Sequence, residues 1–141
     1  MSYAGYLAEG TPLPEPTMDD AGFWENCAQR RLAFQACADC GTLRHPPTPV
    51  CHRCRSAAVT WREAPSRGCV YSYTVVHHPA HDAVRPSVPY VVAVIAFPDF
   101  GPVRLISNII GDPKAVRVDM PVELVWDKVS ETMFLPRFKP A

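Results

Sequence analysis

The sequence of 141 residues has no net charge, no long apolar run and few glycines. Its 14 basic and 14 acidic residues cancel, which argues against a protein that coats nucleic acid or holds a membrane through basic residues. The longest apolar run, Tyr90 to Phe97, is far shorter than the roughly 18 residues that cross a bilayer. The N-terminus lacks a basic segment followed by an apolar one, so we expect a cytoplasmic protein without membrane contact.

Common catalytic motifs are missing as well. The sequence has no G-x-S-x-G elbow, no glycine-rich phosphate loop and no H-E-x-x-H helix. Cys27 and Cys69 have nucleophilic thiols, but no base is evident beside either in the sequence, and the alternative is that both are small buried apolar residues. We therefore expect no catalytic residue in this chain and no catalysis by the chain alone.

Four of the six cysteines form two pairs with the spacing of a zinc ribbon. Within each pair two residues separate the thiols, and the ten residues from Gly41 to Val50 separate the pairs; the ligands are Cys37, Cys40, Cys51 and Cys54. Two such turns complete a tetrahedron of thiolates, which leaves no open position for water or substrate and indicates structural zinc. Gly41 suits the first turn, whereas Arg55 and Ser56 follow the second pair, so the second turn must manage without glycine. His52 is a spare ligand that four cysteines make unnecessary.

The rest of the sequence predicts a mainly β fold. Its 16 prolines exclude a helical bundle, because proline lacks a backbone N–H and breaks helix interiors. Alternating and continuous apolar segments predict strands at residues 68–77, 90–97, 103–110, 121–126 and 132–138. A helical turn is predicted between the third and fourth strands, over 111–116. Five strands in this order are typical of an OB-fold barrel. We predict four parts: a flexible arm over 1–17, an N-terminal helix over 18–34, a rubredoxin-like zinc ribbon over 35–63 and the OB-fold over 64–141.

Between the first two predicted barrel strands lies a loop rich in histidine and proline. His77, His78, His81 and Asp82 have the side-chain types of a second metal or acid–base site, and a freestanding hydrolase would use them. Histidines exposed to solvent, or touching a partner or ligand, are the alternative interpretation.

The order and spacing of these segments resemble the zinc-ribbon, OB-fold, acyl-CoA-associated protein family. The resemblance covers about residues 20–140. It rests on the two cysteine pairs and on Phe23-Trp24-Glu25, Gly68-x-Val70-Tyr71-Ser72-Tyr73-Thr74-Val75, Pro89-Tyr90-Val91-Val92-Ala93, Gly111-Asp112-Pro113, Met120-Pro121-Val122-Glu123 and Leu135-Pro136-Arg137-Phe138.

Membership of that family implies a non-catalytic accessory subunit. Such a subunit binds and completes a thiolase-like enzyme, an aldolase (carbon–carbon lyase), hydratase or acyltransferase that acts on acyl-CoA in lipid or steroid side-chain catabolism. The resemblance assigns structural Zn²⁺ to the four cysteines and no catalytic residue to this chain. Acyl-CoA would then lie at or near the interface with the thiolase-like subunit.

The ribbon also carries arginines that suit phosphate oxygens. Arg44, Arg53, Arg55 and Arg62 are candidate contacts for the phosphates of CoA, and a solvated basic face is the alternative. A nucleic-acid-binding module is the rival function, because zinc ribbons and OB barrels both occur there and aromatic residues stack bases, here Tyr71, Tyr73, Phe97 and Phe100. The eight basic and eight acidic residues of 63–141 argue against it.

Charge is distributed unevenly along the chain. Residues 1–25 carry five acidic and no basic side chains, whereas residues 26–62 carry six arginines and one acid. We expect the acidic arm to lie over the basic ribbon until a partner or CoA displaces it.

Overall fold

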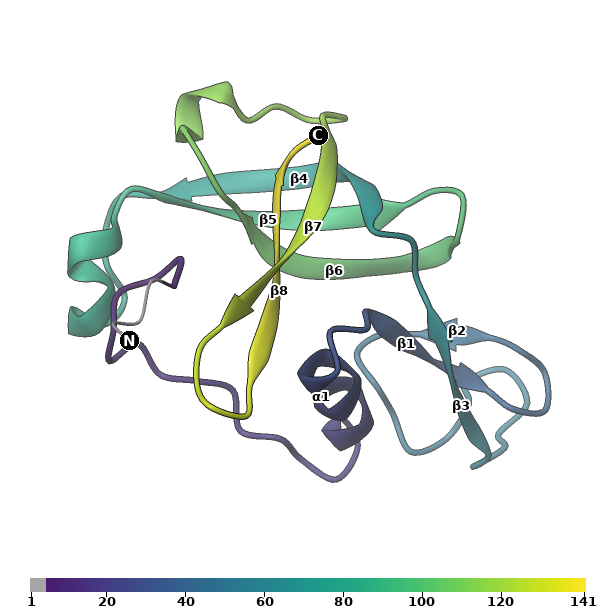
Figure 1. The fold of residues 1–141 in the computed structure, drawn as a ribbon. Coiled ribbons are helices and arrows are strands. Elements are labelled where there is room, and N and C mark those ends of the chain that lie inside the picture. Colours follow the sequence, from purple (N-terminus) through teal and green to yellow (C-terminus); the bar gives the residue numbers. More distant parts are fainter. Residues whose placement is uncertain (1–4) are drawn as a thin grey trace.

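The computed structural model of the chain describes residues 5–141 and shows a small ribbon beside a larger barrel (Figure 1). The ribbon sheet has the order β2-β1-β3, in which β1 (Ala33–Cys37) pairs with β2 (Leu43–Arg44) and with β3 (Val59–Glu63), both antiparallel. The barrel closes in the order β4-β5-β6-β8-β7, with a single parallel contact between β6 and β8. This is the predicted combination of a zinc-ribbon region and a five-stranded OB-fold, and the fold class is confirmed.

The five barrel strands match the predicted segments to within a few residues. They are β4 (Arg67–Val76), β5 (Tyr90–Phe97), β6 (Gly101–Ile109), β7 (Pro121–Lys128) and β8 (Phe134–Pro140). A 3-10 turn over Pro113–Ala115 fills the place of the predicted helical turn. Along β5 every second side chain, from Val91 to Phe97, points into the barrel and is at most 1% exposed. The apolar run is therefore one strand of a filled barrel, closed on itself so that no long sheet edge is left open.

The helix is shorter than predicted. We expected residues 18–34, whereas α1 spans Ala21–Ala28 and buries Phe23 and Cys27. Arg30 then adopts a left-handed conformation with φ of 58°, and the chain continues into β1. From Ala33 the chain forms β1, the central ribbon strand, and all five residues of this strand are buried. A short buried strand and a helix end have similar apolar patterns, so the sequence alone did not separate them.

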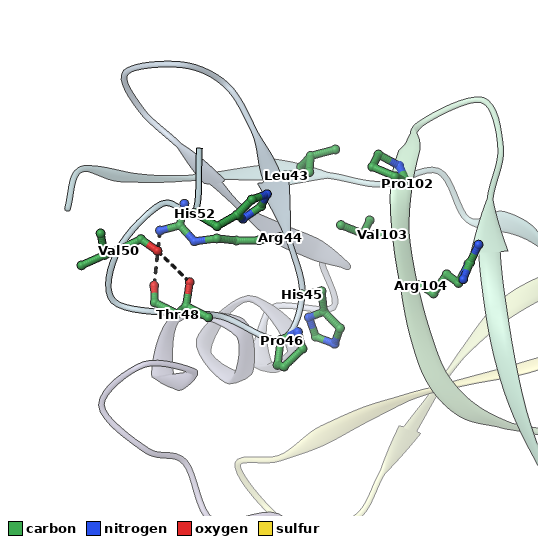
Figure 2. A pocket seen from close by; sticks show the side chains of 10 residues that line it. All are labelled: Leu43, Arg44, His45, Pro46, Thr48, Val50, His52, Pro102, Val103 and Arg104. Atoms are coloured by element: carbon green, nitrogen blue, oxygen red, sulfur yellow. Dashed lines mark hydrogen bonds between the residues drawn. The ribbon is translucent and has the colours of Figure 1, made fainter. Parts of the chain in front are cut away.

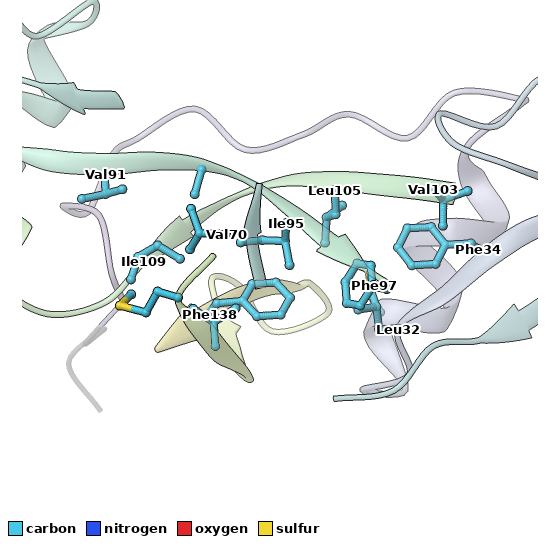
Figure 3. Packing of buried hydrophobic residues seen from close by; sticks show 14 of the residues in the cluster. Leu32, Phe34, Val70, Val91, Ile95, Phe97, Val103, Leu105, Ile109 and Phe138 are labelled. Carbon is cyan, nitrogen blue, oxygen red and sulfur yellow. The ribbon is translucent and has the colours of Figure 1, made fainter. Parts of the chain in front are cut away.

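One apolar core connects the ribbon to the barrel. The ring of Phe34 on β1 lies 5.6 Å from that of Phe97 on β5, and Phe97 lies 6.2 Å from Phe138 on β8 (centroid distances). Figure 3 shows these rings in a row with Leu105 and Val103 of β6. Gly68 on β4 permits a close approach to β5, since a Cβ there would lie 2.7 Å from the Ala96 carbonyl oxygen. The two parts therefore share one packed core.

The described part of the arm packs against the barrel. The phenol of Tyr6 donates to the Ile109 carbonyl (3.0 Å) and accepts from the Val91 amide (3.3 Å), which ties the arm to β5 and β6. The Ala8 amide donates to Ser87 Oγ at 2.9 Å. We expected an arm lying over the ribbon, whereas these contacts place residues 6–8 on the barrel. A charge pattern does not predict them, because each bond joins a neutral backbone group to a hydroxyl group. Residues 1–4 of the predicted arm lie outside the described residues.

Among residues 5–141, no helix has both the length and the apolar character needed to cross a membrane.

Candidate metal centre

The four predicted cysteines come together at the end of the ribbon away from the barrel core. Cys37 ends β1, and the second pair stands in the loop between β2 and β3. All four sulfur atoms lie within 4.8 Å of one another, with 3.4 Å between the sulfurs of Cys37 and Cys54 and 3.7 Å between those of Cys40 and Cys51. Zinc–sulfur bonds of about 2.3 Å put the sulfurs of a tetrahedron about 3.8 Å apart. The cluster therefore fits a zinc ion.

The two turns have the same backbone geometry. In the first, the Cys40 amide points at Cys37 Sγ (3.5 Å) and the Gly41 amide donates to the Cys37 carbonyl (2.9 Å). In the second, the Arg53 amide points at Cys51 Sγ (3.4 Å) and the Arg55 amide donates to the Cys51 carbonyl (2.9 Å). The residue after each cysteine pair therefore makes the same backbone bond, although the second turn lacks glycine there.

Arg55 takes the glycine position without being glycine. Its φ is 63°, against 78° for Gly41, so an L-residue occupies the left-handed region. That conformation costs roughly 1 kcal/mol in a residue with a Cβ. The turn keeps its shape because its amides and the metal define it.

Four thiolates this close together need a cation. Hydrogen bonds from the Cys54 and Arg53 amides lower the pKa of Cys51 to about 6. At Cys54 the Ser56 amide also favours the thiolate, but the thiols of Cys37, Cys40 and Cys51 together with burial outweigh it and raise the pKa to about 12. Sulfurs that compete for negative charge are stabilised together by a divalent ion. Because four cysteines complete the coordination, this zinc is structural.

The four ribbon arginines do not form one patch. Gln35 pairs with Arg44 and Phe34 with Arg62, so consecutive residues of β1 direct these arginines to opposite faces of the ribbon. Arg44 is buried, and the guanidinium of Arg62 lies 5.2 Å from the ring of Phe100. Arg53 and Arg55 are exposed on the second turn. A single phosphate cannot contact all four side chains.

The histidine loop does not form a metal site. His77 and His78 are exposed, His81 Nδ1 accepts a hydrogen bond from the Ala83 amide at 3.0 Å, and Asp82 pairs with Arg85 at 3.0 Å. These contacts cap and close the 3-10 helix over Asp82–Ser87, which the sequence did not predict. In the described chain only the four cysteines cluster as metal ligands.

The other candidate residues have structural positions. Cys27 is fully buried, and burial raises the pKa of its thiol to about 12. Cys69 pairs with Ala96 on the neighbouring strand. Of the four aromatic residues considered for base stacking, Phe97 is 1% exposed and Phe100 lies beneath Arg62, whereas Tyr71 and Tyr73 are exposed. No continuous stacking platform results.

His45 is a partly buried residue that the sequence did not single out. Its ring lies 5.1 Å from the ring of Phe23 and 5.1 Å from that of Phe34, and burial lowers its pKa to about 4. The imidazole is therefore neutral and packs as an aromatic ring between the helix and the ribbon. Nothing local in the sequence signals this role, since it depends on two aromatic residues from other elements.

Known proteins share both parts of the chain. Residues 24–60 match the family model "ChsH2, rubredoxin-like zinc ribbon domain", and residues 61–127 match "ChsH2, C-terminal OB-fold domain". A solved structure named "Ltp2-ChsH2(DUF35) aldolase" has a chain 42% identical to this one, with a TM-score of 0.82, and the alignment covers 91% of this chain and 98% of that one.

Two curated relatives are much longer. A "Probable enoyl-CoA hydratase alpha subunit" of Thermomonospora curvata is 43% identical over 92% of this chain, and the chain spans 40% of its length. A "3-oxo-4,17-pregnadiene-20-carboxyl-CoA hydratase alpha subunit" of Mycobacterium tuberculosis is 34% identical over 80% of the chain, which spans 35% of its length. The chain thus corresponds to somewhat over a third of each of these two proteins.

Proposed function

Because the chain belongs to the ChsH2 (DUF35) family of zinc-ribbon and OB-fold proteins, we propose that it is an accessory subunit that binds and completes a thiolase-like acyl-CoA enzyme. The chain contributes no catalytic residue in this proposal. Its partner carries out the chemistry, as an aldolase or acyltransferase of lipid or steroid side-chain catabolism in the cytoplasm.

The closed metal centre is the observation that carries this proposal. Four cysteines fill the coordination of a zinc ion, and catalytic zinc keeps an open position for water or substrate. The histidine loop is occupied by helix capping and an ion pair. Neither the metal centre nor the histidine loop therefore supplies a catalytic site, which supports a role in binding a partner.

The relatives support the class of partner. One solved relative is named as an aldolase of Ltp2 and ChsH2(DUF35), and both curated relatives are named as alpha subunits of CoA hydratases. Those names combine a CoA thioester with an assembly of more than one polypeptide. The second curated relative is named for a steroid CoA substrate, which supports steroid catabolism as the setting.

Co-expression tests the proposal directly. The chain and a thiolase-like enzyme from the same source are produced together, and their association is measured by gel filtration with metal analysis of the complex. We expect one stable complex containing about one zinc per copy of this chain, and a retro-aldol or acyl-transfer activity that the partner lacks alone. A partner that is fully active alone and does not associate would overturn the proposal.

A matched pair of variants separates the metal centre from the other thiols. Cys40→Ser removes a zinc ligand and should abolish the complex together with the zinc. Cys69→Ser removes a thiol from β4, outside the cluster, and should leave both unchanged.

A further inference from the structure

A hollow of about 630 Å³ lies where the ribbon meets the barrel. We call it the junction hollow; it is lined by Leu43, Arg44, His45, Pro46, Thr48, Val50, His52, Pro102, Val103 and Arg104. Figure 2 shows the loop after β2 on one side and strand β6 on the other. These residues include two arginines and no carboxylate. The hollow is therefore electropositive.

Arg44 is a buried cation without a counter-ion. Only 5% of its surface is exposed, and Nη2 makes its one hydrogen bond, a 3.3 Å contact to the Thr48 carbonyl, while Nε and Nη1 have no acceptor. In residues 5–141 the ion pairs to carboxylates involve other arginines: Arg31, Arg85 and Arg137. An unpaired charge at this depth is costly unless an anion neutralises it.

The opposite end of the hollow has a second cation. Arg104 on β6 is exposed and lies over the ring of Tyr71, 3.7 Å from its centroid, which holds the guanidinium in place. Pro102 and Val103 lie between the two arginines in Figure 2, and Leu43 faces them from the ribbon. The hollow thus has positive charge at both ends and an apolar surface between them.

We propose that the junction hollow binds an organic phosphate, with Arg44 and Arg104 facing its anionic groups and its apolar body on Leu43, Pro102 and Val103. Guanidinium groups suit phosphate oxygens because their N–H groups form paired hydrogen bonds. That the organic phosphate is CoA rests on the proposed function; the anion site itself does not.

This site differs from the predicted arginine patch. Of the four ribbon arginines only Arg44 lines the hollow, and it is joined by Arg104 of the barrel, which the sequence did not single out. Arg53 and Arg55 are exposed on the zinc turn, and Arg62 packs on Phe100. Arg53 is therefore a matched control, an exposed ribbon arginine outside the hollow.

Amide NMR shifts of the full, zinc-loaded chain test the site. CoA, adenosine 3′,5′-bisphosphate and inorganic phosphate are titrated separately to about 10 mM, which detects millimolar affinity. We expect both nucleotides to shift residues 43–52 and 102–104 saturably, and inorganic phosphate to bind more weakly because it does not cover the apolar surface. Arg104→Gln should weaken CoA binding on the order of fivefold, whereas Arg53→Gln should leave it unchanged.

Several results would decide against or refine the site. The absence of saturable shifts with all three probes, or equal weakening by Arg53→Gln and Arg104→Gln, would overturn it. Equal affinity for inorganic phosphate and CoA would support the anion site with free phosphate as its ligand. Co-purification with the partner is measured on the same variants: a normal complex without phosphate binding overturns this site alone. If Arg104→Gln breaks the complex and no phosphate binds, the hollow instead receives an acidic side chain of the partner.

Discussion

The ribbon and the barrel are stabilised by different interactions. Burial in the ribbon is uneven: all of β1 and both residues of β2 are buried, whereas four of the five residues of β3 are exposed. In the barrel each strand has neighbours on both sides, and the interior is filled by side chains such as Ile95 and Phe138, both 0% exposed. The filled interior is sufficient to stabilise the barrel, whereas the fold of the ribbon depends on a metal.

The ribbon and the barrel also differ in charge. Residues 26–62 hold six arginines and one acid, while residues 63–141 are balanced at eight of each. A zinc ion bound by four thiolates carries two net negative charges, which offset part of the basic excess of the ribbon. The net charge of zero therefore describes the barrel region but not the ribbon. The anion binding that we propose lies at the basic ribbon and its border.

Loss of zinc should separate the two regions most strongly. Structural zinc contributes on the order of 10 kcal/mol to the folding of small domains, because the metal binds the thiolates of the folded chain and no preformed site exists in the unfolded chain. We expect Cys51→Ser, or treatment with a chelator, to unfold β2, β3 and the two turns while the barrel strands keep slow amide hydrogen exchange. Exchange measured by mass spectrometry checks this. Equal loss of protection in the barrel would show that the regions are not independent; Cys69→Ser is the control.

Phe97 tests the connection between the regions. Its ring contacts Phe34 of the ribbon and Phe138 of the barrel, and it is 1% exposed. Phe97→Ala leaves a cavity at this junction and should lower the free energy of unfolding by about 3–5 kcal/mol. Chemical denaturation provides the measurement.

The control for that substitution is Tyr73→Ala, which shortens an exposed aromatic on β4. We expect a change below about 1 kcal/mol. If the two variants lose equal stability, the junction is not a packed core.

His45 makes the ribbon side sensitive to acid. Because burial lowers its pKa to about 4, the unfolded chain, with an ordinary histidine pKa near 6.5, binds the proton more readily. Stability is therefore full above about pH 6.5 and falls as the pH approaches 4. We expect His45→Leu to gain roughly 2 kcal/mol relative to the wild type between pH 7 and pH 4.5.

Denaturant unfolding at each pH measures that difference, and acid effects on the zinc thiolates cancel because both chains share them. His77→Gln, an exposed histidine of the barrel loop, should show no relative change. A constant difference between His45→Leu and the wild type would mean that His45 is not buried as a neutral ring.

How far the sequence predicted the molecule also differs between the regions. The metal ligands and barrel strands could be predicted, because both are local patterns: cysteines two residues apart and apolar runs such as Tyr90 to Phe97. The helix end was wrong because β1 is defined by pairing with distant strands. The position of Tyr6 on the barrel and the junction hollow both depend on contacts between residues far apart in the sequence. No local sequence pattern predicts either of them.

Arg55 provides the smallest and most local test of the ribbon. It adopts φ of 63° at the position where the first turn has glycine. Arg53 is not among the described residues with a positive φ. Arg55→Gly relieves the left-handed conformation, and Arg53→Gly removes the same charge and adds the same backbone freedom without relief. We expect the zinc-loaded Arg55→Gly chain to be about 1 kcal/mol more stable than Arg53→Gly. Equal stability in thermal unfolding would show that the metal and the turn amides hold Arg55 there without measurable strain.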